Sequence, residues 1–228
     1  MRVLVRSADG IERGHVTFDR VGNLGCVSNL VVERGAGADL GHALMIAAAD
    51  ALRALGASEW KRDVHADDAD AIALSEQLGM RADHRSTVVR FAWADIAKLP
   101  AELATVTPAA PYEDEDLERA FELPTGRLAM ARRPGRIALQ LRGGDLSVLG
   151  FGVFDPALPG ATPFRVVRPA LAAPLLAALR AHARHDYLQI VVENDDALAD
   201  ALIAAGATVR LRLLHYSGPL TRAESRCA

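Results

Sequence analysis

Residues 32–45 read Val-Glu-Arg-Gly-Ala-Gly-Ala-Asp-Leu-Gly-His-Ala-Leu-Met, a run of small residues between two apolar segments. The segment before it, Gly25–Glu33, is typical of a strand. The segment after it, Leu40–Leu55, has apolar residues at helical spacing and is closed by Gly56. Small residues leave backbone amides open, and the N-terminus of a helix attracts anions. The stretch therefore predicts a strand, a loop and a helix that together can bind a phosphate group.

The patterns on either side of this stretch complete a mixed α/β domain. Two strands parted by a turn signal precede it, and strand, helix and strand patterns follow it. The predicted elements are strands at Val3–Arg6, His15–Phe18, Trp60–His65 and Thr87–Trp93, and a helix at Asp68–Leu78. A hairpin followed by β-α-β-α-β predicts a mixed sheet with helices packed on it.

The composition changes between residues 98 and 116, where three prolines interrupt an Ala/Thr-rich stretch and the acidic run Glu113–Asp116 follows. We predict a first domain at 1–97, a linker at 98–116 and a second domain at 117–228. The acidic run suits the first turn of a helix, because carboxylates are stabilised by the positive end of the helix dipole.

Three short segments of the first half recur in the same order in the second. Residues 14–19 resemble 150–155, residues 51–54 match 178–181, and residues 67–79 resemble 195–206. Matches in a conserved order predict that the two halves are related α/β domains.

A second motif lies on the predicted helix, where residues 68–80 read Asp-Ala-Asp-Ala-Ile-Ala-Leu-Ser-Glu-Gln-Leu-Gly-Met. Together with residues 32–45 it resembles the two motifs of the GCN5-related N-acetyltransferase (GNAT) superfamily, Val-Pro-x-x-Arg-Gly-x-Gly-x-Gly-x-x-Leu-Leu and Asn-x-x-Ala-x-x-Leu-Tyr-x-x-Leu-Gly-Phe. The resemblance covers residues 14–93. It implies two GNAT-like halves in tandem, of which the second is divergent and the first lacks the family's opening strand and two helices.

The resemblance also implies a site for acetyl-CoA, with transfer of its acyl group to an amine. The backbone of one strand would bind pantetheine, and amides of the loop and helix would bind the diphosphate. The cofactor-binding residues carried over are Val31, Val32, Gly37, Ala38, Asp39, Leu40, Gly41, His42 and Asp68. Ser75 stands where the family has tyrosine and would protonate the departing thiolate, while Glu33 or a water would take the amine proton. His65 is a second candidate for the base.

Two departures from the first motif leave the activity open. Ala36 replaces the usual arginine and Asp39 the central glycine. A like charge about 4 Å from a phosphate costs about 1–4 kcal/mol, so Asp39 either weakens the site or caps the helix instead. The chain is therefore either an acyl-CoA-dependent N-acyltransferase or a catalytically degenerate ligand-binding or scaffold protein.

The second half departs further from the family. Its candidate loop at 165–174 contains no glycine, and its prolines remove amide donors. The position of the hydroxyl falls at Leu202, which carries no proton to donate. The first half is thus the better acyl-CoA site, and we expect Arg165 and Arg168 to be surface arginines.

The composition of the chain limits which classes of molecule it is expected to bind. A net charge of −3 offers no broad basic face for nucleic acid, and two cysteines cannot form a disulfide framework or a metal site. No apolar run is long enough for a membrane helix, so we expect a cytoplasmic protein. His182 and His185 lack a third ligand nearby, and no metal is expected. The acceptor is a small-molecule or peptide amine, and a homodimer remains an open alternative.

Overall fold

The computed structural model describes residues 1–6, 11–35 and 38–220. The chain divides into two compact units, and each contains residues from distant parts of the sequence. The first unit is Met1–Arg85 with Leu213–Ala228, and the second is Ser86–Arg212. Two long strands, β5 (Arg81–Ala92) and β11 (Thr208–Pro219), each contribute residues to both units.

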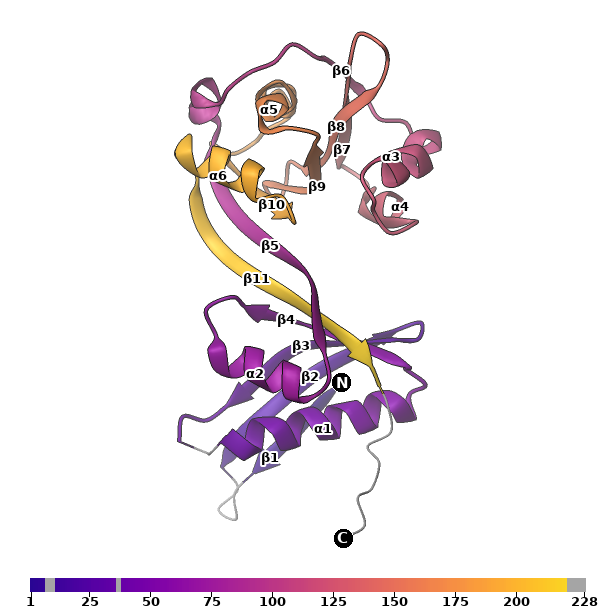
Figure 1. Cartoon of the computed structure of the whole chain (residues 1–228), viewed down its shortest axis with the longest axis vertical. Helices are drawn as coiled ribbons and strands as arrows, with labels where there is room; N and C mark the ends of the chain where they lie inside the picture. The colour runs from indigo at the N-terminus through magenta and orange to yellow at the C-terminus, as the bar shows by residue number, and fades with distance from the viewer. Residues whose placement is uncertain (7–10, 36–37, 221–228) are drawn as a thin grey trace. The chain divides into compact units, whose positions relative to one another are not determined.

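The first unit is a sheet with two helices (Figure 1). Its elements are β1 (Arg2–Arg6), β2 (Glu12–Val21), β3 (Leu24–Val32), α1 (Ala38–Ala54), β4 (Glu59–His65) and α2 (Ala69–Gln77). The strand order is β1-β2-β3-β4-β11, in which β3 and β4 run parallel and the other neighbours antiparallel. The end of β11 therefore pairs with β4, although about 150 residues separate them along the chain.

The core of the first unit lies between α1 and the strands. Leu44, Met45, Ala48 and Leu52 are fully buried, at the i, i+1, i+4 and i+8 spacing that forms one face of a helix. This face packs on β2 and β3, where Gly25 allows close approach: a Cβ at Gly25 would lie 2.6 Å from the Leu52 side chain. Burial of each leucine contributes about 2 kcal/mol, and this packing fixes α1 against β3.

The second unit is a sheet with helices on both faces. Its helices are α3 (Asp114–Ala120), α4 (Arg127–Ala131), α5 (Ala172–Arg180) and α6 (Asp196–Ala204), and short 3-10 turns lie at Trp93–Lys98, Pro111–Glu113 and Pro169–Leu171. Its strands are β6 (Thr105–Pro108), β7 (Ile137–Arg142), β8 (Val148–Asp155), β9 (Gly160–Val166) and β10 (Tyr187–Glu193), in the order β5-β10-β9-β8-β7-β6. Phe151 and Val153 on β8 pack in the cluster that contains α3 and α4, while Gly152 faces α5.

The predicted mixed α/β fold is confirmed, but the units differ from the predicted domains. Residues 98–116 were expected to be a linker, whereas they contain β6, which pairs with β7, and the start of α3. The acidic run does occupy the first turn of α3. The predicted boundaries also assign 213–228 to the second domain, although β11 pairs with β4 in the first unit.

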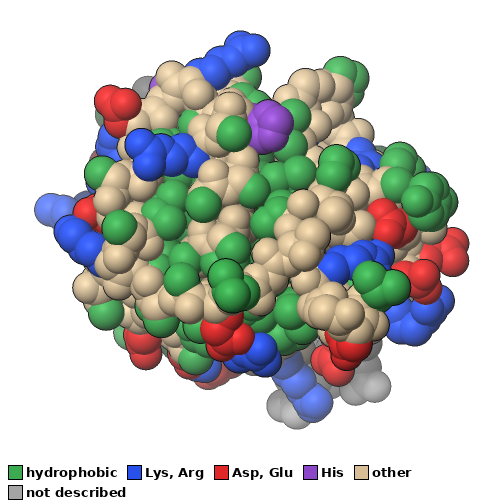
Figure 2. Space-filling model, turned by 90° about the horizontal axis from the view of Figure 1, so that it is seen from above, with side chains coloured by type: hydrophobic (Ala, Val, Ile, Leu, Met, Phe, Trp, Pro, Cys, Tyr) green, Lys and Arg blue, Asp and Glu red, His purple; other side chains and the backbone are tan. Residues whose placement is uncertain are grey.

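Within the described residues, no helix has the length and hydrophobicity needed to cross a bilayer. On the face drawn in Figure 2, acidic and basic side chains are interspersed toward the margin and hydrophobic side chains gather nearer the centre.

Candidate functional site

The first unit contains a cleft where β3 and β4 diverge. The two strands pair from Leu24 with Glu59 as far as Val27 with Arg62, and no further. A bulge interrupts the pairing of β2 with β3 at the same level, and it leaves Ser28 as an extra residue. Bulges bend the strand that carries them, so β3 turns away from β4 and the backbone of residues 28–32 no longer pairs with β4.

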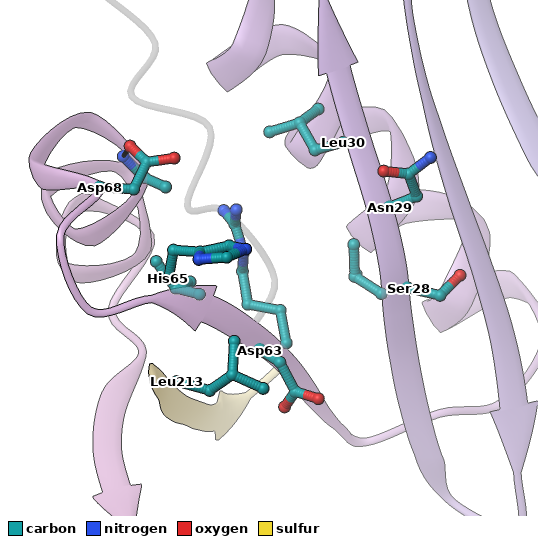
Figure 3. Close-up of a pocket in the computed structure, with 11 residues that line it drawn as sticks. Ser28, Asn29, Leu30, Asp63, His65, Asp68 and Leu213 are labelled. Carbon is teal, nitrogen blue, oxygen red and sulfur yellow. Dashed lines mark hydrogen bonds between the residues drawn. The ribbon is translucent and has the colours of Figure 1, made fainter. Parts of the chain in front are cut away.

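The cleft has a volume of about 340 Å³. Figure 3 shows residues of β3 on one side, and residues of β4 with the start of α2 on the other. The lining residues are Val27, Ser28, Asn29, Leu30, Arg62, Asp63, Val64, His65, Asp68, Ala71 and Leu213. The cleft is therefore bounded by polar and charged groups at the ends of two parallel strands, all of them in the first unit.

Arg62 is the buried charge of this cleft. Burial alternates along β4, so Trp60, Arg62 and Val64 point to the same interior side. Arg62 is only 7% exposed, and its Nη1 atom has no hydrogen-bond partner among the described residues. Burial lowers the pKa of the guanidinium, and the nearby Asp68 carboxylate opposes that effect. An arginine remains charged at ordinary pH despite such a shift, so the cleft holds a cation.

Asp68 and His65 lie near the N-terminus of α2. Asp68 is the N-cap of α2, where its Oδ1 accepts a hydrogen bond of 2.9 Å from the amide of Ala71. His65 is mostly exposed, and its Nδ1 lies 3.9 Å from Oδ1 of Asp67. An exposed imidazole that lines the cleft is placed where a general base could act.

A second polar cluster lies on the neighbouring strands. Nδ1 of His215 is 2.7 Å from Oδ1 of Asp63, and the rings of His215 and His84 stack with centroids 4.0 Å apart. The hydrogen bond from His215 lowers the pKa of Asp63, which burial partly offsets. Figure 3 shows the Asp63 carboxylate directed away from Asp68. The Asp63 carboxylate is thus hydrogen-bonded to His215 and not to Arg62.

The residues predicted to bind the cofactor follow β3 into α1. Val31 is 42% exposed, and His42 is exposed on α1. Leu40 and Gly41 pack toward the core, with Gly41 below the side chains of Val32 and Leu74. Gly37 lies outside the described residues, and of Ala38 only its place at the start of α1 is described. Among the predicted residues whose side chains the structure describes, Asp68 lines the cleft and the others do not.

Asp39 is exposed and is the second residue of α1. Its carboxylate therefore lies in the first turn of the helix and not before it. As the N-cap, Asp39 would lie just before the helix, whereas α1 already begins at Ala38. A difference of one or two residues is usual for helix boundaries.

Neither predicted catalytic residue lines the cleft. Ser75 is fully buried, and its hydroxyl donates a hydrogen bond of 2.7 Å to the carbonyl of Ala71 within α2. The carboxylate of Glu33 is exposed and forms an ion pair of 2.6 Å with Arg13, and Glu33 does not line the cleft. His65 is the base candidate that does.

The second unit has the same divergence of parallel strands, but an ion pair spans it. β9 and β10 pair only at Gly160 with Gln189 and Ala161 with Ile190. Beyond that point Arg165 on β9 bonds to Glu193 on β10 at 2.5 Å, and both side chains are largely buried. Arg168 is a surface arginine as expected and pairs with Glu102, whereas Arg165 was also expected at the surface and is largely buried.

Neither a protein-family model nor a curated protein sequence matches the chain. Solved structures do match along nearly its whole length. A GCN5-related N-acetyltransferase from Sphaerobacter thermophilus aligns with a TM-score of 0.62 at 18% identity, over 97% of this chain and 81% of the other. A tandem GNAT protein from the clavulanic acid biosynthesis pathway aligns with a TM-score of 0.57 at 16% identity, over 98% and 83%. The chain has the GNAT fold.

A third similar structure is one region of a larger, multi-domain protein. The GCN5-related glucosamine N-acetyltransferase region of a fungal multi-domain GH3 β-N-acetylglucosaminidase aligns with a TM-score of 0.55 at 16% identity, over 94% of this chain and 32% of the other. At these identities the structural alignments show the GNAT fold, and they do not identify a substrate for this chain.

Sequence reasoning missed Arg62 within this GNAT fold. The signal was present, because Trp60, Arg62 and Val64 alternate with polar residues along a predicted strand. A charged residue on the side of a strand that otherwise carries apolar side chains indicates either a buried ion pair or a ligand site.

Proposed function

We propose that the first unit is an acyl-CoA-dependent N-acyltransferase, with acetyl-CoA as the simplest donor. The observation that supports this proposal best is the divergence of β3 and β4, which leaves the β3 backbone from Ser28 to Val32 unpaired on the β4 side beside a polar cleft. An extended pantetheine arm can add to such an edge through its amides. The diphosphate would then lie at the N-terminus of α1, where helix amides lack partners.

The exposed imidazole of His65 would act as the base. It takes a proton from the amine, and the amine nitrogen attacks the thioester carbonyl. A C–N bond forms, the C–S bond breaks, and the thiolate departs into an open cleft where water can protonate it. Solvent would thus take the part that the family resemblance implies for a side-chain hydroxyl, because Ser75 is buried.

We further propose that the two units are tandem GNAT-like halves and that only the first binds CoA. In the first unit the strand divergence is an open cleft, whereas in the second the Arg165–Glu193 ion pair crosses it. The acceptor would be a small-molecule or peptide amine, and the cytoplasm, where acyl-CoA is available, would be the compartment. A homodimer stays a prediction from the sequence.

One observation favours the rival function, a degenerate ligand-binding or scaffold protein. The hydroxyl expected at the thiolate is bonded inside α2, so the family's proton donor is missing from the cleft. The rival predicts CoA binding, or no binding, without turnover.

Thiol release distinguishes the two functions. The native protein is incubated with acetyl-CoA and a panel of primary amines: a polyamine, amino acids, an aminoglycoside and a peptide with a free N-terminus. An acyltransferase releases CoA faster with one of these amines than without, and His65→Ala lowers that rate about 100-fold. His182→Ala, an exposed histidine of the second unit, is the matched control and should retain the native rate. CoA release that no amine accelerates would favour the scaffold.

A further inference from the structure

The closed end of the cleft carries a cation that the proposed reaction does not use. Val27 and Arg62 form the last pair of the β3–β4 ladder, so Arg62 lies where the two strands begin to separate. Arg62 lines the cleft and is only 7% exposed. Its Nη1 atom has no hydrogen-bond partner among the described residues.

A buried guanidinium with an unused donor is costly for the fold. A charged group taken out of water loses several kcal/mol unless its donors are satisfied, and an apolar side chain of similar size is often as stable there. The neighbours on the same side of β4, Trp60 and Val64, are apolar. Arg62 therefore has no evident structural advantage over an apolar residue in the unliganded protein.

The acidic groups of the cleft do not satisfy this donor. Oδ1 of Asp68 accepts the bond from the Ala71 amide that caps α2, and Asp68 acts on Arg62 only as a nearby charge. The carboxylate of Asp63 bonds to His215. An anionic ligand that enters the cleft could bond to the Arg62 guanidinium without displacing either interaction.

We propose that Arg62 binds a carboxylate at the far end of the transferred acyl group, so that the preferred donor is a CoA thioester of a dicarboxylic acid. The proposal rests on the proposed function, which sets the direction of the donor. With the diphosphate at the start of α1 and the pantetheine arm along β3 from Val32 toward Ser28, the acyl group points at the rung formed by Val27 and Arg62. A planar guanidinium matches a carboxylate through parallel hydrogen bonds.

The test compares two donors of equal chain length, succinyl-CoA and butyryl-CoA, by calorimetric titration of the full chain. The native protein should bind succinyl-CoA about tenfold tighter than butyryl-CoA. Arg62→Met should remove the preference, and Arg62→Lys, which keeps the charge without the planar fork, should keep a smaller one. Thermal unfolding of each variant establishes that it is folded, which we expect because methionine is apolar and matches the aliphatic part of the arginine side chain in length.

A third probe, free succinate, separates the failure of this inference from the failure of the proposed function. Equal affinity of the native protein for succinyl-CoA and butyryl-CoA would overturn the carboxylate site and leave acyl-CoA binding intact. A rise in melting temperature with succinate that Arg62→Met abolishes, without binding of any CoA compound, would overturn the donor assignment and the proposed function but retain a carboxylate site at Arg62. No response to any of the three probes would overturn both.

Discussion

Nη2 of Arg165 lies 2.5 Å from Oε2 of Glu193, and this ion pair joins β9 to β10 beyond the last residues at which those strands pair. In the first unit no such bridge between β3 and β4 is found among the described residues, and a cleft lined by Arg62 lies there instead. The same divergence of parallel strands thus has two outcomes, one bridged by protein charges and one open to a ligand.

The bridge should be a substantial part of the stability of the second unit. Arg165→Met leaves Glu193 mostly buried, with Arg127 at 3.4 Å as a remaining cationic neighbour. We expect a loss of about 3 kcal/mol in the free energy of unfolding, measured by urea titration. Arg168→Met breaks an exposed pair with Glu102, which solvent screens, and should cost far less. Equal losses from the two variants would contradict the structural role of the bridge.

Two aspartates with the same capping geometry separate stability from binding. Asp68 caps α2 and Asp195 caps α6, each accepting a 2.9 Å hydrogen bond from the amide three residues on. Replacement of either by alanine should cost about 1 kcal/mol of unfolding free energy. Only Asp68→Ala should also change the affinity for acyl-CoA, because Asp68 lines the cleft. Affinity that responds equally to both variants would mean that Asp68 acts through helix stability alone.

Ser75 should be dispensable for turnover. Its buried hydroxyl bonds to the Ala71 carbonyl, so Ser75→Ala is expected to cost about 1 kcal/mol of stability or less and to leave the rate of CoA release within twofold of native. The rate is measured with the amine identified by the thiol-release panel. A loss of tenfold or more in kcat, with thermal stability retained, would restore Ser75 as the proton donor.

The Asp63–His215 contact predicts a component of acid denaturation. Because His215 lowers the pKa of Asp63 in the folded chain, Asp63 binds protons more weakly there than in the unfolded chain. Its stabilising contribution is therefore complete above its ordinary pKa of 3.8 and is lost as the pH falls through the lower folded value. Unfolding of Asp63→Asn from pH 7 to pH 3 should show a shallower loss below pH 4 than the native protein. Asp200→Asn, at an exposed position of α6, should follow the native curve.

Local patterns in the sequence were sufficient to predict most elements of the first half of the chain. The run of small residues before Leu40 and the spacing from Leu44 to Leu52 required a strand, a loop and an amphipathic helix, and β3 and α1 have that order. The partner of β11 could not be predicted in this way. Pairing of Tyr216 with Arg62 is a contact between distant residues, and nothing in the local sequence of either strand specifies it.

The candidate site was harder to predict because its chemistry depends on which way side chains point. Ser75 aligns with a family position, but it lies four residues after Ala71 and three before Leu78, on the face of α2 that packs against the core. Helical periodicity alone indicates that burial, whereas the proposed catalytic role came from the motif alone. Glu33 could not be assigned without its partner, since Arg13 lies on the neighbouring strand.

Binding of acyl-CoA in the cleft of the first unit can be measured by calorimetric titration of CoA into three proteins. They are the native chain, Asn29→Trp, which fills the exposed β3 side of the cleft, and Val167→Trp, an equally bulky change at the exposed residue after β9. We expect micromolar binding by the native chain and by Val167→Trp, and none by Asn29→Trp. A native chain that does not bind CoA, or an Asn29→Trp variant that binds it as tightly as the native chain does, would rule out this binding site.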